Sequence, residues 1–93
     1  MKKRSNKVVL VYGHFNVIHP GHLRFLRFAK ECGNKLVVGI ESDKIVDKSV
    51  DINEKLRFNA VKNISWVDEV FIYHQNIKKI INKIKPNIVV KGK

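Results

Sequence analysis

The stretch from Gly13 to His22 constrains the fold most, because it joins an apolar run to a helical pattern through a short glycine-containing turn. Val8 to Tyr12 is a continuous run of apolar, mostly β-branched residues, which is typical of a strand covered on both faces in a parallel sheet. Pro20 suits the first turn of a helix, where its missing N–H costs nothing. The stretch therefore predicts a strand, a turn and a helix N-terminus in direct succession.

This junction is suited to bind an anion. A helix N-terminus presents unpaired backbone N–H groups and a partial positive charge, which together favour a phosphate. We expect His19 at the cap and His22 in the first turn, so that both imidazoles reach one phosphate chain. Gly21 lacks a Cβ and would let a ligand approach the backbone closely. The alternative for an isolated pair of this spacing is an ordinary helix start.

The rest of the chain alternates between helical and strand patterns. Spacings of three and four residues predict three helices, with apolar stripes of Phe25, Phe28, Ala29 and Cys32, then Leu56, Ala60, Val61 and Ile64, then Ile77, Ile80, Ile81 and Ile84. Gly33 and Pro86 are placed to end the first and last of them, and Asp51 with Glu54 resembles a capping box at the start of the second. Residues 35–40, 67–73 and 87–91 have strand character, and 42–50 is a polar segment that would form a loop or a short helical turn.

This order predicts an α/β fold, a Rossmann-like three-layer sandwich in which a parallel sheet carries helices on both faces. Ligands of such sheets bind beyond the carboxyl ends of the strands, and the turn after Tyr12 leaves the first strand at that edge. We find no repeat, low-complexity segment or linker, so residues 1–93 form one domain.

The charge and composition limit the classes of partner that the chain would bind. The formal charge of +11 indicates an acidic partner such as a nucleotide, a phosphorylated metabolite or a nucleic acid, although general compositional bias would give the same excess. Because 93 residues give only a modest core, association into a homodimer or a missing segment should be considered. Cys32 is the single cysteine, which excludes an intrachain disulfide and a cysteine-based zinc site. No apolar run approaches the roughly 20 residues of a membrane helix, and we expect a cytoplasmic protein with no membrane partner.

The turn carries a family resemblance. Residues 13–22, Gly-His-Phe-Asn-Val-Ile-His-Pro-Gly-His, resemble the G-x-F-[DN]-x-x-H-x-G-H signature of the cytidylyltransferase-like nucleotidyltransferases, the superfamily that shares its HIGH-type motif with class I aminoacyl-tRNA synthetases. Residues 37–43, 67–70 and 85–92 resemble, in the same order, segments of the branch acting on glycerol phosphate and heptose phosphate. The resemblance extends over essentially the whole chain and implies the same Rossmann-like fold.

The resemblance also implies a reaction. A phosphorylated sugar or polyol would attack the α-phosphate of CTP or ATP, and pyrophosphate would leave. Mg²⁺ would enter with the triphosphate, and no metal site made of protein ligands is expected. Such transfer depends on positioning and charge stabilisation, because the phosphate oxygen of the acceptor is already a nucleophile.

The resemblance assigns roles to individual residues. His19 and His22 match the catalytic histidines, which would donate hydrogen bonds to phosphate oxygens. The nucleotide-binding positions of the turn are Gly13, His14, Phe15, Asn16, Pro20 and Gly21. Lys48, or alternatively Lys44, matches a phosphate-binding lysine, and Arg57 matches an arginine on the substrate side. Considered as residues alone, the two lysines would be solvated, and Arg57 would pair with Glu54 or Asp68.

One departure leaves alternatives open. The family continues beyond the equivalent of Gly92 with base-binding residues and a Ser/Thr-rich second signature, whereas this sequence ends at Lys93 and contains no threonine. We therefore expect the family domain to be incomplete at its C-terminal end. A non-catalytic nucleotide-binding partner and a basic nucleic-acid-binding module are the other two hypotheses, the second disfavoured because helical spacing buries most aromatic residues.

Overall fold

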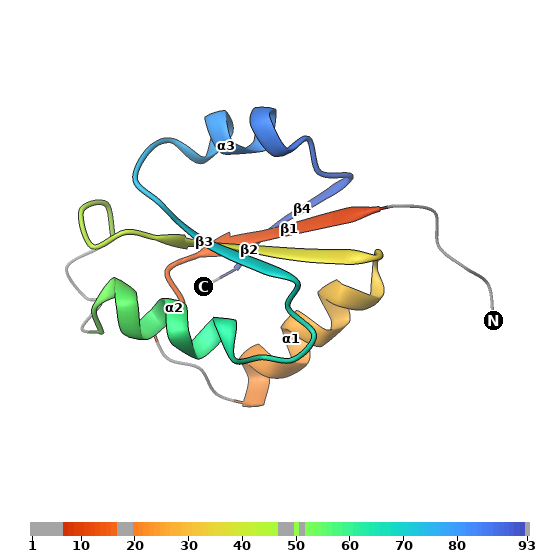
Figure 1. Ribbon diagram of the computed structural model, residues 1–93, viewed down its shortest axis with the longest axis horizontal. Helices are drawn as coiled ribbons and strands as arrows, with labels where there is room; N and C mark the ends of the chain where they lie inside the picture. The colour runs from red at the N-terminus through yellow and green to blue at the C-terminus, as the bar shows by residue number, and fades with distance from the viewer. Residues whose placement is uncertain (1–6, 17–19, 47–49, 51, 93) are drawn as a thin grey trace.

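Strands and helices alternate along the whole chain in this computed structural model (Figure 1). The structure describes residues 7–16, 20–46, 50 and 52–92, with only the backbone for residues 20 and 21. The elements are β1 (Val8–Gly13), α1 (Pro20–Glu31), β2 (Lys35–Glu41), α2 (Glu54–Lys62), β3 (Glu69–Tyr73), α3 (Ile77–Ile84) and β4 (Ile88–Lys91). The predicted order is confirmed, and β3 begins two residues later than residue 67 and β4 one residue later than residue 87.

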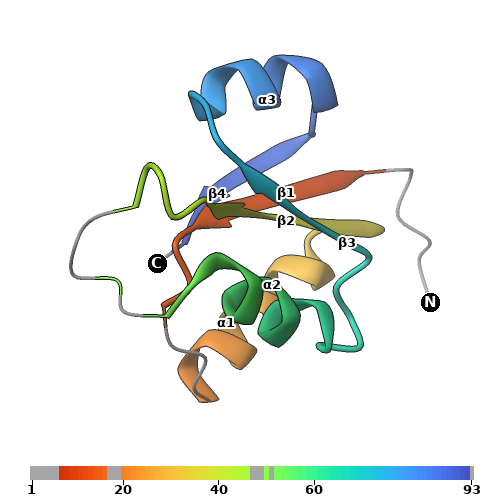
Figure 2. The same cartoon turned by 60° about the vertical axis from the view of Figure 1, so that its left-hand side comes forward.

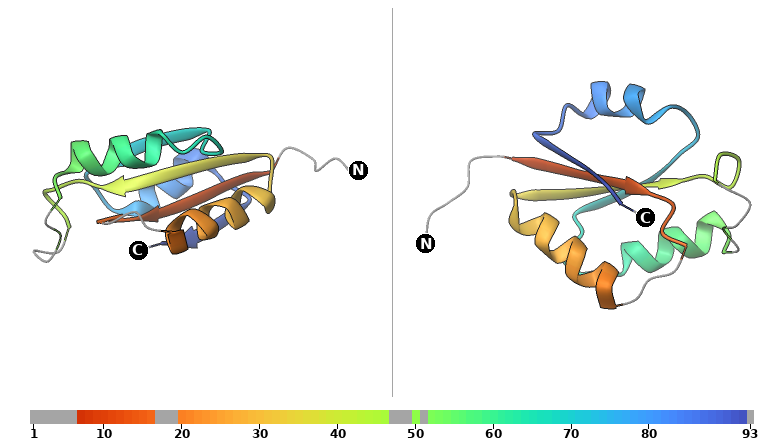
Figure 3. Two further views of the ribbon diagram at one scale, coloured as in Figure 1. Left: turned by 90° about the horizontal axis from the view of Figure 1, so that it is seen from below. Right: turned by 180° about the vertical axis from the view of Figure 1, so that it is seen from behind.

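The strands form one parallel sheet in the order β3-β2-β1-β4. Helices α1 and α2 cover one face of it, and α3 alone lies over the other (Figures 1 and 2). Figure 3 shows the same three layers from below and from behind. The predicted Rossmann-like α/β fold with helices on both faces is therefore confirmed.

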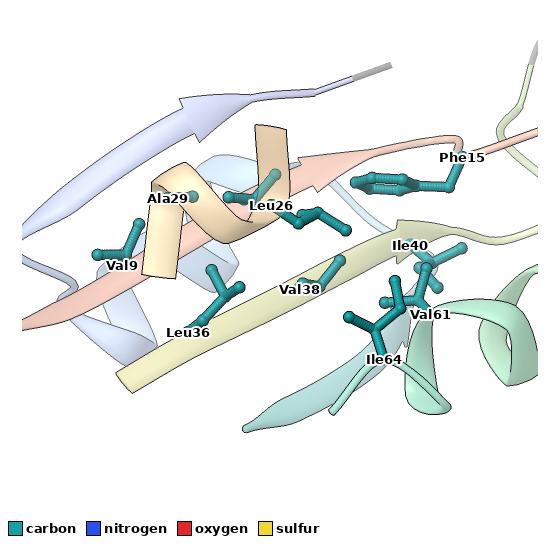
Figure 4. Packing of buried hydrophobic residues seen from close by; sticks show 10 residues of the cluster. Val9, Phe15, Leu26, Ala29, Leu36, Val38, Ile40, Val61 and Ile64 are labelled. Carbon is teal, nitrogen blue, oxygen red and sulfur yellow. The ribbon is translucent and has the colours of Figure 1, made fainter. Parts of the chain in front are cut away.

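The main core lies between the sheet and the α1/α2 layer. Alternate residues of β1 and β2 point into it and meet side chains from both helices and from the loop after α2 (Figure 4). Its buried members are Val9, Val11, Phe15, Leu26, Ala29, Leu36, Val38, Ile40, Val61 and Ile64. On the other face α3 has no fully buried residue, so the expected isoleucine stripe packs only in part.

Two helical stripes differ from those predicted. Phe28 is 66% exposed, and Leu26, about 200° away around α1, is buried in its place. On α2 the buried positions are Arg57 and Val61, whereas Leu56 is 59% exposed and Ala60 is also exposed. The apolar pattern was misleading because the helix turns an arginine inward, where backbone carbonyls satisfy the charge.

The predicted capping box at Asp51 and Glu54 is wrong. Asn53 is the N-cap of α2, and its Oδ1 accepts a hydrogen bond from the N–H of Leu56. Asp51 itself lies outside the described residues. Asn76 caps α3 in a similar way, and Lys85 ends that helix in the left-handed conformation with φ 53° before Pro86.

The amino end of the sheet is closed by three Asx residues that each precede a strand. The N–H of Asn34 donates to the carbonyl of Lys7, and the N–H of Lys7 donates to Oδ1 of Asn34. Asn87 makes the same exchange with Val8, and Asp68 makes it with Leu36. Each side chain thereby extends one strand pair by a further hydrogen bond.

Candidate active site

The core side chains support the turn after β1. Phe15 has a left-handed backbone with φ 51°, which is unusual for a bulky residue and costs of order 1–3 kcal/mol. Its ring is buried and extends back over the sheet among the core side chains (Figure 4). A Cβ at Gly92 would lie 3.2 Å from the Cζ atom of Phe15, so a glycine there leaves room for the ring. The core thus supports a strained turn at the carboxyl end of β1.

Arg57 fixes the same turn from the side. This residue is 1% exposed, and its Nη1 donates to the carbonyl of His14 at 2.8 Å and to that of Glu41 at 2.7 Å. Its Nε donates to the carbonyl of Ile52 at 2.8 Å, and its Nη2 donates to Oδ1 of Asp43 at 2.7 Å. One guanidinium therefore joins the turn after β1 to the end of β2 and to the segment before α2.

Asp43 is the charged partner of Arg57. Its carboxylate accepts from the backbone N–H of Glu54, at the start of α2, and from the guanidinium of Arg57. These two interactions, in that order, lower the pKa of Asp43 below its ordinary value. The N–H of Asp43 donates in turn to Glu54 Oε1 at 2.8 Å. Asp43 and Glu54 therefore fasten the segment after β2 to the N-terminus of α2.

The expected structural partners of Arg57 were wrong. Glu54 binds the N–H of Asp43, and Asp68 pairs with Lys30 at the opposite end of the sheet. The sequence held a signal for the true partner, because Asp43 follows β2 by two residues, at the edge where the turn after β1 also lies. Which of several acidic residues would reach Arg57 depended on tertiary structure.

Asn16 adds a second connection between the two loops. Its Oδ1 accepts a hydrogen bond from the N–H of Ile52 at 3.3 Å, while its own N–H donates to Nδ1 of His14 at 3.4 Å. The predicted nucleotide-binding residues Gly13, His14, Phe15 and Asn16 thus lie together in one supported turn. Their contact with a nucleotide stays a prediction.

The helix that follows begins as expected. Pro20 is the first residue of α1, Gly21 the second, and His22 lies in the first turn. The His22 ring is half-buried and tilted by 58° against that of Phe15, with 6.4 Å between the centroids, and its Nδ1 is shielded from solvent. The core side chain that holds the turn therefore also orients this imidazole. His19, the expected cap, lies outside the described residues.

The expected phosphate-binding lysines fall on the segment between β2 and α2. Lys44 is exposed there, and its N–H donates to Oγ of the buried Ser42 at 3.3 Å. Lys48 lies outside the described residues. Arg57, assigned by resemblance to the substrate side, points at backbone carbonyls, so we treat it as a residue that positions the turn.

Ligands for a metal are not gathered at this site. Within the described ranges, no three His, Cys, Asp or Glu side chains lie close enough together to bind an ion. Mg²⁺ that enters with a triphosphate needs no such cluster, because it keeps several waters and takes oxygens from the phosphates. The described chain also contains no helix with the length and apolar character of a membrane span.

Comparisons with known proteins agree with this geometry. The chain is 35% identical over 98 aligned residues to the Bifunctional protein HldE of Helicobacter pylori strain J99, covering 99% of this chain and 21% of that protein. It is 32% identical over 97 residues to the protein of the same name from Actinobacillus pleuropneumoniae, with 98% and 20% covered. The chain thus spans about a fifth of the length of these relatives.

A solved structure matches the fold. The lipopolysaccharide core biosynthesis protein from Thermoplasma volcanium superposes with a TM-score of 0.83 at 25% identity, over 91% of this chain and 73% of that one. The family model described as Cytidylyltransferase-like matches residues 10–93, which include the turn, His22 and Arg57. The chain therefore belongs to the cytidylyltransferase-like family, as its resemblance to these nucleotidyltransferases indicated.

Proposed function

We propose that this chain transfers CMP or AMP from CTP or ATP onto a phosphorylated sugar or polyol, with release of pyrophosphate. The observation that carries the proposal is the supported turn after β1, which leads into α1 with His22 in its first turn. Its backbone is fixed from the core by Phe15 and from the side by Arg57. A fixed turn at a helix N-terminus is suited to hold a triphosphate without reorganisation.

The proposed reaction is a displacement at the α-phosphorus of the nucleotide. An oxygen of the acceptor phosphate forms a bond to the α-phosphorus, and the bond from that phosphorus to the bridging α–β oxygen breaks. The electron pair leaves with pyrophosphate. The His22 imidazole, the amides at the start of α1 and His19 would donate hydrogen bonds to the phosphate oxygens as negative charge accumulates. Bound Mg²⁺ would neutralise charge on the triphosphate and on the departing pyrophosphate.

Lysines of the segment between β2 and α2 would complete the phosphate site. Lys44 is exposed on this segment, which Arg57 and Asp43 fasten to the turn. Lys48 follows it on the same segment. Either ammonium group would bind phosphate as a mobile point charge rather than in a fixed fork geometry.

Pyrophosphate release tests the proposal directly. We expect release from CTP or from ATP only when a sugar or polyol phosphate is present. His22→Ala should lower kcat about 10²–10³-fold, the usual cost of removing one donor to a developing oxyanion. Arg24→Ala, on an exposed position of the same helix, is the matched control and should leave kcat unchanged.

Three outcomes would contradict the proposal. Nucleotide binding without turnover, in this chain and in a version extended to the full reading frame, would indicate a non-catalytic nucleotide-binding module. Affinity for nucleic acid that falls steeply with salt and survives His22→Ala would indicate a nucleic-acid-binding module. Equal rates for His22→Ala and the parent chain would remove the imidazole from the mechanism.

A further inference from the structure

One face of helix α1 points away from the rest of the molecule. Arg24, Arg27, Phe28 and Glu31 are all exposed, and the helical repeat places them within about 100° of one another around the axis. Among the large apolar side chains of the described residues, Phe28 is the most exposed, at 66%. Seen from below, no other helix or strand covers this face (Figure 3). We call these four residues the outer row of α1.

The two ends of the outer row carry opposite charges. Within the described ranges, neither Arg24 nor Glu31 takes part in an ion pair. Arg27 lies four residues before Glu31, a spacing at which the two could pair. Its guanidinium lies instead over the ring of Trp66, 6.0 Å from the centroid. The row therefore presents a cation at one end, an anion at the other, and the ring of Phe28 between them.

The spacing makes the outer row complementary to itself. Arg24 and Glu31 are seven residues apart, which is two helical turns or about 10 Å along the axis, and Arg27 and Phe28 lie midway. If a second α1 lies antiparallel along the row, its Glu31 comes beside Arg24 and its Arg24 beside Glu31. Each Phe28 then covers the Arg27 of the other copy, which Trp66 already holds from its own side. One two-fold axis through the middle of the row satisfies all four residues.

A second copy of the chain fits this face better than other partners do. An acidic surface would attract Arg24 but would meet Glu31 with like charge, and an apolar surface would leave both charges without a partner. Arginine and aromatic side chains are also the types on which protein interfaces most depend for affinity. The charge of +11 on each copy opposes association, but about 0.1 M salt screens this repulsion beyond about 10 Å, whereas the pairs across the row are in direct contact.

We propose that the outer row of α1 joins two copies of this chain in an antiparallel, two-fold dimer. One pair of helices buries less than the roughly 1,200 Å² of a stable interface, so we expect a dissociation constant of about 10⁻⁴ M. The inference does not rest on the proposed function. Each candidate active site is formed by the turn and the helix start of its own chain, so association should leave the turnover of each chain unchanged.

Sedimentation equilibrium between about 10 µM and about 1 mM tests the association, because this range spans the expected dissociation constant. The parent chain should pass from monomer towards dimer. Phe28→Ala should raise the dissociation constant at least tenfold, since it removes the ring at the centre of the interface. The matched control is Leu56→Ala on α2, another exposed apolar side chain at 59%, which should leave the constant unchanged. Thermal melts check that each variant folds.

Charge reversal tests the pairing itself. Arg24→Glu opposes two carboxylates across the two-fold axis of its own dimer, and Glu31→Arg opposes two guanidinium groups. Each variant alone should therefore stay monomeric at about 1 mM. Mixed in equal amounts, the two variants restore both pairs of opposite charge, so a heterodimer should form with about the affinity of the parent dimer. Lys55→Glu, an exposed reversal on α2, is the matched control and should not weaken the parent dimer.

Three results would overturn the proposed dimer. A monomer at every concentration would show that the outer row does not join two copies. A dimer that Phe28→Ala and both charge reversals leave unchanged would place the interface on another face. A mixture of Arg24→Glu and Glu31→Arg that stays monomeric would show that the two residues do not pair across the axis. A dimer with the expected variant pattern but without nucleotidyl transfer would support this interface and contradict only the proposed function.

Discussion

At the amino end of the sheet three Asx side chains each close one strand pair, whereas at the carboxyl end one buried guanidinium joins two loops. Each of these residues, Asn34, Asn87 and Asp68, lies near solvent and exchanges two hydrogen bonds with one residue of the neighbouring strand. Arg57 donates to three carbonyls and one carboxylate from a buried position. Two of these contacts also share one lysine, because Nζ of Lys30 donates to the carbonyl of Asn34 and to the carboxylate of Asp68. The amino end is therefore built from several small contacts near solvent, whereas the end that carries the proposed site depends on one buried side chain.

Removing Arg57 gives the largest expected effect. Arg57→Met preserves much of the buried volume but leaves the carbonyls of His14, Glu41 and Ile52 without their donor. We expect the free energy of unfolding, measured with urea, to fall by about 3–5 kcal/mol, as when one partner of a buried ionic network is removed. Arg57→Lys keeps the charge but not the fork of donors, so its loss should be smaller yet substantial.

A fall of less than about 1 kcal/mol for Arg57→Met would contradict the comparison, because several small contacts would then hold the carboxyl end as well. Nucleotidyl transfer should be lost in Arg57→Met under conditions where the variant is still folded. Full activity there would show that the turn after β1 keeps its geometry without the guanidinium.

The amino end should respond weakly and additively. Asn34→Ala and Asn87→Ala each remove one exposed side-chain acceptor, and each should cost about 1 kcal/mol of unfolding free energy. The two contacts bind the adjacent residues Lys7 and Val8, but they belong to different strand pairs and share no partner, so the double variant should cost their sum with a coupling energy below about 1 kcal/mol. A coupling energy above about 1 kcal/mol would show that the amino end also acts as a unit.

Acid should lower the stability of the fold through both ends of the sheet, by protonating Asp68 at the amino end and Asp43 at the carboxyl end. Partial burial raises the pKa of Asp68, but hydrogen bonds from the Lys30 ammonium and the Leu36 N–H lower it by more, so the pKa is below its ordinary value. The pKa of Asp43 is lowered by the Glu54 N–H and by Arg57. A carboxyl with a lowered folded pKa stabilises the fold above its unfolded pKa of about 3.8, and this stability is lost as the pH falls through the folded value.

The measurement is the urea midpoint between about pH 3 and pH 7 for the parent chain, Asp43→Asn and Asp68→Asn. Each variant should be less stable at neutral pH and should lose less on acidification than the parent chain. Identical acid profiles for all three proteins would mean that neither carboxylate contributes through its charge.

The sequence predicted the fold well where local and tertiary signals agreed. The alternation of strand and helix patterns was sufficient for the layers, and Pro20 correctly marked the start of α1. The stripe of α2 failed because burial of Arg57 depends on carbonyls from segments distant in the sequence. Asn53 was overlooked as a cap because Asp51 and Glu54 matched a known pattern, and only the three-dimensional structure showed Glu54 engaged with Asp43.

The sequence predicted where the candidate site lies but not which residues support it. The residues of the turn are contiguous, so the motif placed them together, with His22 in the first turn of α1. The hydrogen bonds from Arg57 to the turn and to the end of β2 could not be read from the sequence, because they depend on which strands lie side by side.

The smallest expected effect concerns the ion pair of Lys35 with Glu69, which lies at the amino end beside the Asx contacts. Both side chains are about half exposed, so solvent screens the attraction, and two long side chains lose conformational freedom to form it. Lys35→Ala should therefore change the unfolding free energy by less than about 0.5 kcal/mol, and high salt should reduce that difference further. A loss above about 1 kcal/mol would place this exposed pair with the Asx contacts, and the amino end would then depend on charge as well as on backbone hydrogen bonds.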